Sequence, residues 1–344
     1  MTERRVLPLA LTLGEPAGIG PDLTIQIWRQ RAELGLPAFY LVGDPDFIRR
    51  RAQLLGTALD VQVVEPSQAG EAFTRALPIV PLEAPVSALP GKPDASSAPA
   101  AIASIRRAVA DVLAGNAAAV VTNPVAKNVL YRSGFAEPGH TEFLAKLAQD
   151  ATGMQLRPVM MLWAPELAVV PVTIHLPLRD VVSRLTSDLI VESGKIVERD
   201  LRERFRIARP RLAVAGLNPH AGEAGSLGEE DHMIVEPAVK RLQSDGIDVI
   251  GPLPADSLFH ARARATYDVA LCMYHDQALI PIKTLAFDHA VNVTLGLPFV
   301  RTSPDHGTAF DIAGTGGAKP LSLVAAILLA ARLSANTPAL VPAT

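Results

Sequence analysis

Short apolar runs alternate with helix-like stretches along most of this chain, and no other feature restricts its fold more strongly. Residues 6–13 lead through a glycine-containing turn into a predicted helix over 22–32, and residues 39–43 lead into a predicted helix over 44–56. Apolar runs of this length fit buried strands. Because strands that alternate with helices are typical of parallel sheets, we predict an α/β protein.

The chain length of 344 residues predicts two lobes, because single cores rarely grow beyond roughly 250–300 residues. Residues 64–101 are rich in Pro, Ser and Ala, and we expect a long surface excursion without regular structure there. Helix is predicted again over 101–115. The nearly uncharged helix predicted over 321–333 is expected in the core or in a subunit interface.

The composition argues against nucleic-acid and membrane partners. A net charge of −3 gives no excess of positive charge for binding nucleic acid, and 5% aromatic residues leave few rings for base stacking. The apolar segment 321–332 is too short to span a bilayer. The single cysteine, Cys272, excludes an intramolecular disulfide, fits a reducing compartment and is expected to be packed and inert rather than nucleophilic. We therefore expect a cytoplasmic protein.

Three of the eight histidines end apolar runs that we predict to be buried strands. His175 closes the run from residue 167, His220 ends the stretch from 211, and His275 ends the stretch from 268. Ligands bind outside the carboxyl ends of strands in an open parallel sheet. Three imidazoles at one such edge can bind a divalent cation and leave a coordination position for substrate. The alternative is three unrelated loop histidines, but their shared placement favours the metal site.

Two further segments have the composition of ligand loops. Gly14, Gly18 and Gly20 allow a tight turn, but their spacing matches neither the Rossmann fingerprint nor a P-loop, so a structural turn and a ligand loop both remain open. His140 and Thr141 open a predicted helix, where an imidazole and a hydroxyl can cradle an anion. Alternatively, Thr141 only caps that helix.

The segment 216–231 combines glycines with Asn218, His220 and Glu223, which indicates tight turns near a ligand. Its acidic end, residues 229–231, is expected to be a solvated or capping run and not a set of ligands.

Further along, Asp276 follows His275 directly. It can be a metal ligand itself, a hydrogen-bond partner that orients the ligand His275, or a base. Lys283 and Arg301, with Asn292 between them, suit a carboxylate or a phosphate, although ordinary surface charges are the alternative.

Taken in order, the strings GEPAGIGPD, TNPVAK, GHTE, TIHLPL, GLNPHAGE, GPLPADSLF, YHDQ and TLGLPFVRTSPDHGTA resemble the 4-hydroxythreonine-4-phosphate dehydrogenase family of the vitamin B6 pathway. The resemblance runs from about residue 7 to the terminal helix. DHGTAFDIAGTGGA is also similar to the nucleotide loop of isopropylmalate and isocitrate dehydrogenases. The resemblance implies a two-lobed isopropylmalate-dehydrogenase-like α/β fold, with the active-site cleft between the lobes and a nicotinamide cofactor bound without a Rossmann fingerprint.

On this basis we expect a cofactor-side lobe over residues 1–128 plus 287–344, and a metal-binding and dimerisation lobe over 129–286. The family's metal site takes ligands from both subunits of a homodimer, so the resemblance implies a homodimer with a shared active site. It also implies one divalent cation per site, which the donor set leaves open among zinc, cobalt, manganese and magnesium.

Carried over by matching motif, the resemblance assigns residues to three roles. The metal ligands are His175, His220 and His275. The substrate contacts are His140, Thr141, Lys283, Asn292 and Arg301. The cofactor contacts are His306, Gly307, Thr308 and Asp311. A carboxylate at Asp311 would accept the ribose hydroxyls and repel a 2′-phosphate, which favours NAD over NADP. One departure from the family pattern is Ala278, where a glycine often follows YHDQ, and its methyl group would tighten the pocket.

The implied reaction is NAD-linked oxidation of 4-phosphooxy-L-threonine with decarboxylation to 3-amino-2-oxopropyl phosphate. The metal would lower the pKa of the substrate alcohol, and Asp256 or Asp276, with Lys283 nearby, would take or relay the proton. Relatives on the same scaffold oxidise threonate or erythronate phosphates or cyclic cis-diols. A metallohydrolase and a non-catalytic ligand sensor are alternatives of other classes, but a hydrolase would not need the DHGTAFDIAG loop.

Overall fold

The computed structural model describes residues 6–132, 137 and 139–337. The chain divides into two compact units, Met1–Pro158 with Leu297–Thr344, and Val159–Gly296. Both units combine helices with β-strands, so the predicted two-lobed α/β class is confirmed. The observed boundaries differ from the predicted ones, because the first falls after residue 158 instead of 128 and the second after 296 instead of 286.

Packing explains both differences. Helices α5 (Lys127–Arg132) and α6 (His140–Thr152) pack on α4 (Ser97–Leu113), and apolar side chains of α6 join the core of the first unit. Strand β11 (Val291–Leu295) pairs antiparallel with β6 (Val159–Ala164), so it belongs to the second unit.

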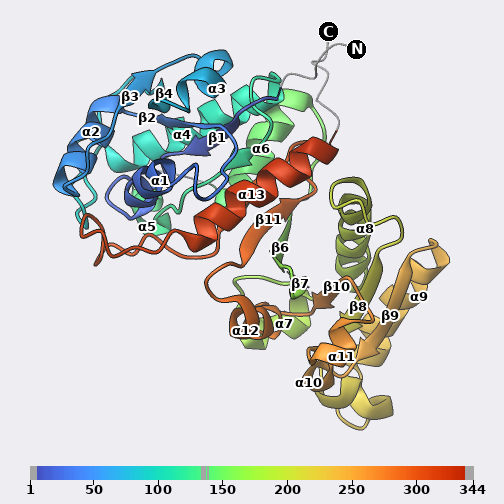
Figure 1. Ribbon diagram of the computed structural model, residues 1–344. Coiled ribbons are helices and arrows are strands. Elements are labelled where there is room, and N and C mark those ends of the chain that lie inside the picture. The colour runs from blue at the N-terminus through green and yellow to red at the C-terminus, as the bar shows by residue number, and fades with distance from the viewer. Residues whose placement is uncertain (1–5, 133–136, 138, 338–344) are drawn as a thin grey trace, which may run out of the picture. The chain divides into compact units, whose positions relative to one another are not determined.

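The first unit contains a parallel sheet in the order β3-β4-β2-β1-β5-β12 (Figure 1). Its strands are β1 (Leu9–Thr12), β2 (Phe39–Gly43), β3 (Val61–Val63), β4 (Leu77–Pro81), β5 (Val120–Val121) and β12 (Arg301–Pro304). Strands β1 and β2 are buried along their whole length. Full burial of consecutive residues is expected when helices cover both faces of a parallel sheet.

The predicted surface excursion over 64–101 is wrong in part. Strand β4 lies inside the sheet between β2 and β3, and four of its five residues are buried. Two prolines, Pro78 and Pro81, hid this strand, because proline lacks an N–H group and argues against a central strand. The short segments η1 (Pro66–Gln68) and α3 (Ala69–Ala72) precede β4, and α4 begins at Ser97.

The remaining helices of the first unit follow the predicted pattern. They are α1 (Gly20–Arg29), α2 (Pro45–Leu54) and α13 (Leu321–Asn336). Half of α13's residues are buried, as its lack of charge predicted. The α4 helix is followed by Gly115, whose φ of +73° allows the chain to turn back after the helix.

The second unit contains a mixed sheet in the order β11-β6-β7-β10-β8-β9. Strand β7 (Leu167–Pro171) pairs antiparallel with β6, whereas β7, β10 (Val269–Cys272), β8 (Arg211–Ala215) and β9 (Asp248–Leu253) are parallel neighbours. Cys272 is buried in β10, where burial raises the pKa of its thiol, so the prediction of an inert cysteine holds.

The helices of the second unit are α7 (Leu178–Arg184), α8 (Ser187–Glu203), α9 (Glu236–Ser244), α10 (Ala255–Leu258), α11 (Ala261–Arg264) and α12 (His275–Ala286). Two irregular helical segments, η2 (Pro219–Gly225) and η3 (Asp231–Val235), lie between β8 and α9. Figure 1 shows α7 beside α12, and residues of both line one cavity.

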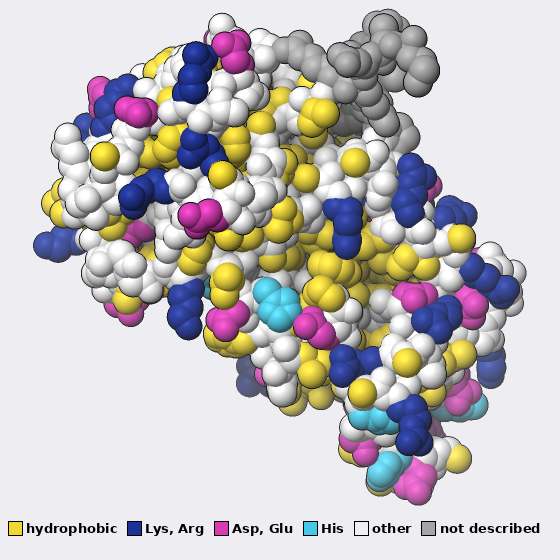
Figure 2. All heavy atoms as spheres, in the orientation of Figure 1, with side chains coloured by type: hydrophobic (Ala, Val, Ile, Leu, Met, Phe, Trp, Pro, Cys, Tyr) yellow, Lys and Arg dark blue, Asp and Glu magenta, His cyan; other side chains and the backbone are white. Residues whose placement is uncertain are grey.

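Within the described part of the chain, no helix has the length and apolar character that a bilayer span requires. On the face shown in Figure 2, Lys and Arg side chains are interspersed with Asp and Glu.

Candidate active site

The three predicted metal ligands follow neighbouring strands of the second unit. Strand β10 pairs parallel with β7 on one side and with β8 on the other, so the carboxyl ends of the three strands share one edge. His175 lies four residues beyond β7, His275 is the first residue of α12 after β10, and His220 lies in η2 after β8. The histidines thus take the placement that the apolar runs predicted.

Two of these histidines lie close together. The ring centroids of His175 and His275 are 6.0 Å apart. Both rings line a cavity of about 280 Å³ together with other residues of α7, of α12 and of the segments that lead into these helices. Its lining consists of Thr173, His175, Leu176, Leu178, Val181, Tyr274, His275 and Asp276.

The spacing of the imidazole pair lies near the upper limit for two rings bound to one divalent cation. Metal–nitrogen bonds of about 2.0–2.1 Å place the centroids of two rings on one ion at most roughly 6.5 Å apart, and the observed 6.0 Å satisfies this limit. The Nδ1 atom of His275 lies 2.7 Å from Oδ1 of Asp276. Because a carboxylate can only accept, Nδ1 donates this hydrogen bond and Nε2 keeps its lone pair for a cation.

His220 lies outside that cavity. Among the described residues, no group of three or more His, Cys, Asp or Glu side chains is arranged to hold a metal ion. His220 belongs to a turn in which residues 220–224 all have positive φ angles, from 42° to 78°. His175 has a φ of 54°. Left-handed backbone costs non-glycine residues about 1–2 kcal/mol each, and such strain is concentrated at functional sites.

A chain of hydrogen bonds joins the strand ends that carry the histidines. The Thr173 hydroxyl donates to the Met273 carbonyl at 2.7 Å, which links the end of β7 to the end of β10. The buried Gln277 side chain accepts from the Met273 amide at 2.6 Å and donates to the Gly216 carbonyl at 2.7 Å. Gln277 therefore bridges the segments that lead to His275 and to His220.

A cluster of buried polar and cationic side chains, the cationic cluster, lies in the first unit around Arg301, His140 and Thr122. Arg301 on β12 is 4% exposed and donates from Nη2 to the hydroxyl of Thr122 at 2.6 Å. Thr122 follows β5, which pairs with β12, so the sheet itself holds these two side chains together. His140 begins α6, and its buried Nε2 has no hydrogen-bond partner among the described residues.

The electrostatics of this cluster favour an anion. Burial lowers the pKa of His140 well below its usual value, and the charges of Arg301 and Lys127 lower it further. Burial also lowers the pKa of Arg301 to about 10, so the guanidinium remains charged at neutral pH. A neutral imidazole can donate a hydrogen bond, and a desolvated guanidinium attracts carboxylate or phosphate strongly.

The other predicted substrate contacts are divided between the units. Thr141 lies in the first turn of α6, but the N-cap is Gly139 and no side chain caps the helix, so the capping alternative is wrong. Lys283 and Asn292 lie in the second unit, on α12 and β11. The Asn292 side-chain oxygen is buried and has no hydrogen-bond partner among the described residues.

The glycine loop after β1 packs directly against two other loops. A Cβ atom on Gly14 would lie 2.6 Å from the Pro124 carbonyl oxygen, and one on Gly18 would lie 2.9 Å from the Thr308 carbonyl oxygen. The amide of Ile19 donates to that same Thr308 oxygen at 3.0 Å. The glycines therefore let the loop support the segment that carries the predicted cofactor contacts, whereas Asp311 in that segment is exposed.

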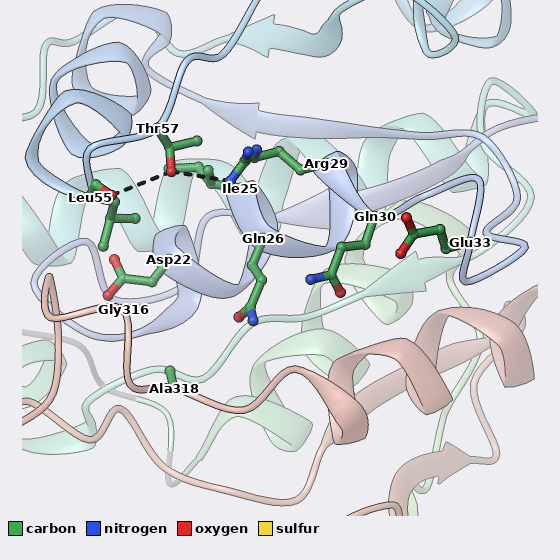
Figure 3. A pocket seen from close by; sticks show the side chains of 10 residues that line it. All are labelled: Asp22, Ile25, Gln26, Arg29, Gln30, Glu33, Leu55, Thr57, Gly316 and Ala318. Carbon is green, nitrogen blue, oxygen red and sulfur yellow. Dashed lines mark hydrogen bonds between the residues drawn. The ribbon is translucent and has the colours of Figure 1, made fainter.

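A separate groove of about 490 Å³ runs along α1 beside the end of the predicted cofactor segment (Figure 3). It contains none of the four predicted cofactor contacts. Its lining consists of Asp22, Ile25, Gln26, Arg29, Gln30, Glu33, Leu55, Thr57, Gly316 and Ala318. Asp22 pairs with Arg51 at 2.5 Å and accepts from the Gly314 amide, so it ties α1 to the glycine-rich segment.

Sequence reasoning missed or misread three residues near these sites. Lys127 carries charge close to His140, and Gln277 bridges two histidine-bearing segments. Asp231 is not part of a solvated run, because it is buried and accepts backbone hydrogen bonds. The helical spacing of Asp231 from the buried Val235 and Ala238 was the signal that could have revealed its burial.

A close imidazole pair that lines a cavity and a cluster of buried cationic groups are features of an α/β enzyme acting on a small charged molecule. Residues 36–330 match the family described as pyridoxal phosphate biosynthetic protein PdxA, and the chain belongs to this family. The resemblance found in the sequence motifs is therefore confirmed.

Relatives and solved structures agree with this assignment. A 4-hydroxythreonine-4-phosphate dehydrogenase of Bradyrhizobium diazoefficiens is 64% identical over 343 residues, covering 97% of this chain and 99% of that protein. The crystal structure of the Klebsiella pneumoniae 4-hydroxythreonine-4-phosphate dehydrogenase matches with a TM-score of 0.83 and 38% identity, covering 95% and 99% of the two chains. A terephthalate 1,2-cis-dihydrodiol dehydrogenase from Burkholderia xenovorans matches with a TM-score of 0.62 and 30% identity, covering 95% and 98%.

Proposed function

We propose that this protein oxidises 4-phosphooxy-L-threonine with NAD and decarboxylates it to 3-amino-2-oxopropyl phosphate, as a step in pyridoxal phosphate biosynthesis. The observation that carries the proposal is 64% identity, over nearly the full length of both proteins, to a 4-hydroxythreonine-4-phosphate dehydrogenase. The cationic cluster and the imidazole pair supply the two kinds of group that this substrate requires.

The phosphate or carboxylate of the substrate is assigned to the cationic cluster around Arg301. Arg301 supplies a fixed, buried guanidinium, and His140 supplies a neutral imidazole with a buried Nε2. Lys127 adds a second positive charge, and Thr141 adds a hydroxyl in the first turn of α6. Lys283 and Asn292 are assigned to the same substrate by their motif.

His175, His275 and His220 would hold a divalent cation, with His220 supplied by a second copy of the chain in a homodimer. This division is supported by the close pair within one chain and by the separate position of His220. A bound zinc, cobalt, manganese or magnesium ion would act as a Lewis acid on the substrate alcohol. Asp276 orients the His275 ring through Nδ1 and so determines which nitrogen is available.

The proton of the alcohol is assigned to Asp256 or Asp276, with Lys283 nearby. Asp276 already accepts a hydrogen bond from His275, and proton uptake by Asp276 would weaken that contact. Asp256 lies on α10, which packs against the η2 turn that carries His220. We therefore favour Asp256. Substitution of Asp256 by Asn should lower kcat about 100–10,000-fold, whereas the same change at Asp276 should mainly weaken metal binding.

The cofactor is assigned to the loop of His306, Gly307, Thr308 and Asp311. The Asp311 carboxylate favours NAD, because it would repel the 2′-phosphate of NADP. Asp311→Ser should reduce the preference for NAD over NADP by roughly tenfold in kcat/KM, which is about 1.4 kcal/mol.

We also propose a cytoplasmic location, which the single, buried Cys272 fits.

A screen of NAD reduction tests the proposed function. Candidate substrates are 4-phosphooxy-L-threonine, threonate and erythronate phosphates, and cyclic cis-diols, each with and without a chelator. The proposal expects NADH formation and carbon dioxide release with 4-phosphooxy-L-threonine, both lost with the chelator. NADH formation only with a diol would assign the chain to the activity named for its 30%-identical relative. Phosphate release without NADH would indicate a metallohydrolase.

A further inference from the structure

The η2 turn has a backbone conformation that its sequence does not favour. His220, Ala221, Glu223 and Ala224 have φ angles of 52°, 52°, 42° and 54°. In this region the Cβ atom of an L-residue crowds the following carbonyl oxygen, and non-glycine residues adopt it singly and not in succession. The turn must therefore be held by the structure around it.

Asp231 provides that support from a buried position. Its side chain accepts from the Leu217 amide at 2.7 Å through Oδ1 and from the Asn218 amide at 2.9 Å through Oδ2. Asp231 is 1% exposed, so these bonds are shielded from water. Both amides immediately precede the turn, and their fixed orientation determines how the chain enters it.

Close packing against Gly216 restricts the turn further. A Cβ atom on Gly216 would lie 2.7 Å from the Ala221 Cα atom and 3.1 Å from Oδ1 of Asp231. The turn thus lies directly on the backbone at the end of β8, with Asp231 beside it. A Cβ atom on Gly222, inside the turn, would likewise lie 3.3 Å from the Asp231 Cβ atom, so Asp231 packs against the turn itself.

We propose that Asp231 is a positioning residue that holds residues 220–224 in their left-handed conformation and so sets the direction of the His220 imidazole. This inference rests on the proposed role of His220 as a metal ligand. Two acceptor oxygens are needed at once, which a carboxylate has and an asparagine side chain lacks. Residues that orient metal ligands typically change metal affinity about 10–100-fold when they are replaced.

Zinc affinity, measured by calorimetry on the purified full-length protein, tests the proposal. Asp231→Asn is expected to weaken zinc binding about 10–100-fold. Asp231→Glu keeps both acceptors and is expected to stay within a few-fold of wild type. Glu230→Gln is the matched control, because the Glu230 carboxylate accepts from the Asn218 side chain at 2.8 Å, whereas Asp231 accepts from the backbone amides before the turn, and the affinity should stay unchanged.

A rescue variant separates positioning from a general loss of structure. Glycine adopts positive φ without strain, so Ala224→Gly added to Asp231→Asn should restore most of the lost affinity. If Asp231→Asn does not fold, Gly216→Ala disturbs the same turn without changing charge and should weaken zinc binding similarly. The absorption spectrum of bound Co²⁺ should shift in Asp231→Asn and return in the rescue variant.

Unchanged zinc affinity in both Asp231→Asn and Gly216→Ala, or no recovery with Ala224→Gly, would overturn the positioning role while leaving the proposed function intact. Absence of zinc binding by the wild-type protein would instead overturn the proposed metal site together with this inference.

Discussion

The two candidate sites differ in how the chain builds them. In the first unit, Arg301 and Thr122 come from paired parallel strands and are held by the sheet and its core. In the second unit, His175 and His220 lie on connections beyond the strands and have left-handed backbone. A site inside a sheet needs little further support. A site on connecting segments needs a supporting set of hydrogen bonds, here from Thr173, Gln277 and Asp231.

The largest effect should come from breaking the imidazole pair. His275→Ala is expected to lower kcat at least about 1000-fold and to abolish zinc binding, because one of two close ring donors is lost. Calorimetry with zinc and the NADH assay measure the two effects. His289→Ala is the control, because His289 is a partly exposed histidine of the same unit that contacts Glu166. Unimpaired zinc binding by His275→Ala would exclude the pair as a metal site.

Substitution within the cationic cluster should change substrate affinity and leave metal binding unchanged. Arg301→Met is expected to raise KM about 100-fold, or about 2.7 kcal/mol, with zinc affinity unchanged. Because burial lowers the pKa of Arg301, its charge carries a desolvation cost, and the variant should melt at a higher temperature than wild type. Arg241→Met serves as the control, because Arg241 is exposed. A normal KM in Arg301→Met would show that the cationic cluster does not bind the substrate.

The hydrogen-bonded link between strand ends should contribute moderately to stability. Gln277→Met leaves the Met273 amide and the Gly216 carbonyl without their buried partner and should lower the free energy of unfolding by about 1–2 kcal/mol. Urea unfolding measures this difference. Gln149→Met on the exposed face of α6 should change stability little, and equal stabilities for the two variants would show that the bridge has no energetic role.

The smallest effect should be a pH dependence of the free energy of unfolding that arises from His140. The folded state holds this imidazole neutral, whereas the unfolded state takes up a proton below its ordinary pKa of 6.5. The unfolded state therefore binds more protons in that window, and stability should fall as pH falls below 6.5, by up to about 1.4 kcal/mol per pH unit. His140→Gln should flatten this dependence in urea unfolding between pH 6.5 and about 5.5. If the free energy of unfolding of His140→Gln depends on pH as strongly as that of wild type, the His140 imidazole is not held neutral by burial.

Regular patterns made most of the fold predictable from sequence. The apolar runs that become β1, β2, β8 and β10 were found because buried parallel strands are continuously apolar. Strand β4 was missed, because Pro78 and Pro81 argue locally against a strand. Pairing with β2 and β3 and burial between them outweigh that local preference. The unit boundaries were misplaced because packing of α6 on α4 is a tertiary effect with no local signature.

The chemistry-bearing residues were predictable, but their support was not. Histidines at the ends of apolar runs can be found because strand ends in a parallel sheet share one edge. The role of Asp231 depends on a hydrogen bond across thirteen or more residues to the amides of Leu217 and Asn218, which no periodicity reveals. Lys127 was likewise visible as a charge but not as a neighbour of His140.

Complementation between inactive subunits tests most directly whether the imidazole site is shared by two copies of the chain. His220→Ala and His275→Ala chains, each inactive alone, would be co-expressed with different tags and purified as mixed dimers. A shared site predicts one intact site in each mixed dimer, hence about half the wild-type activity and one zinc ion per dimer. Mixed dimers with neither activity nor zinc would contradict the shared site.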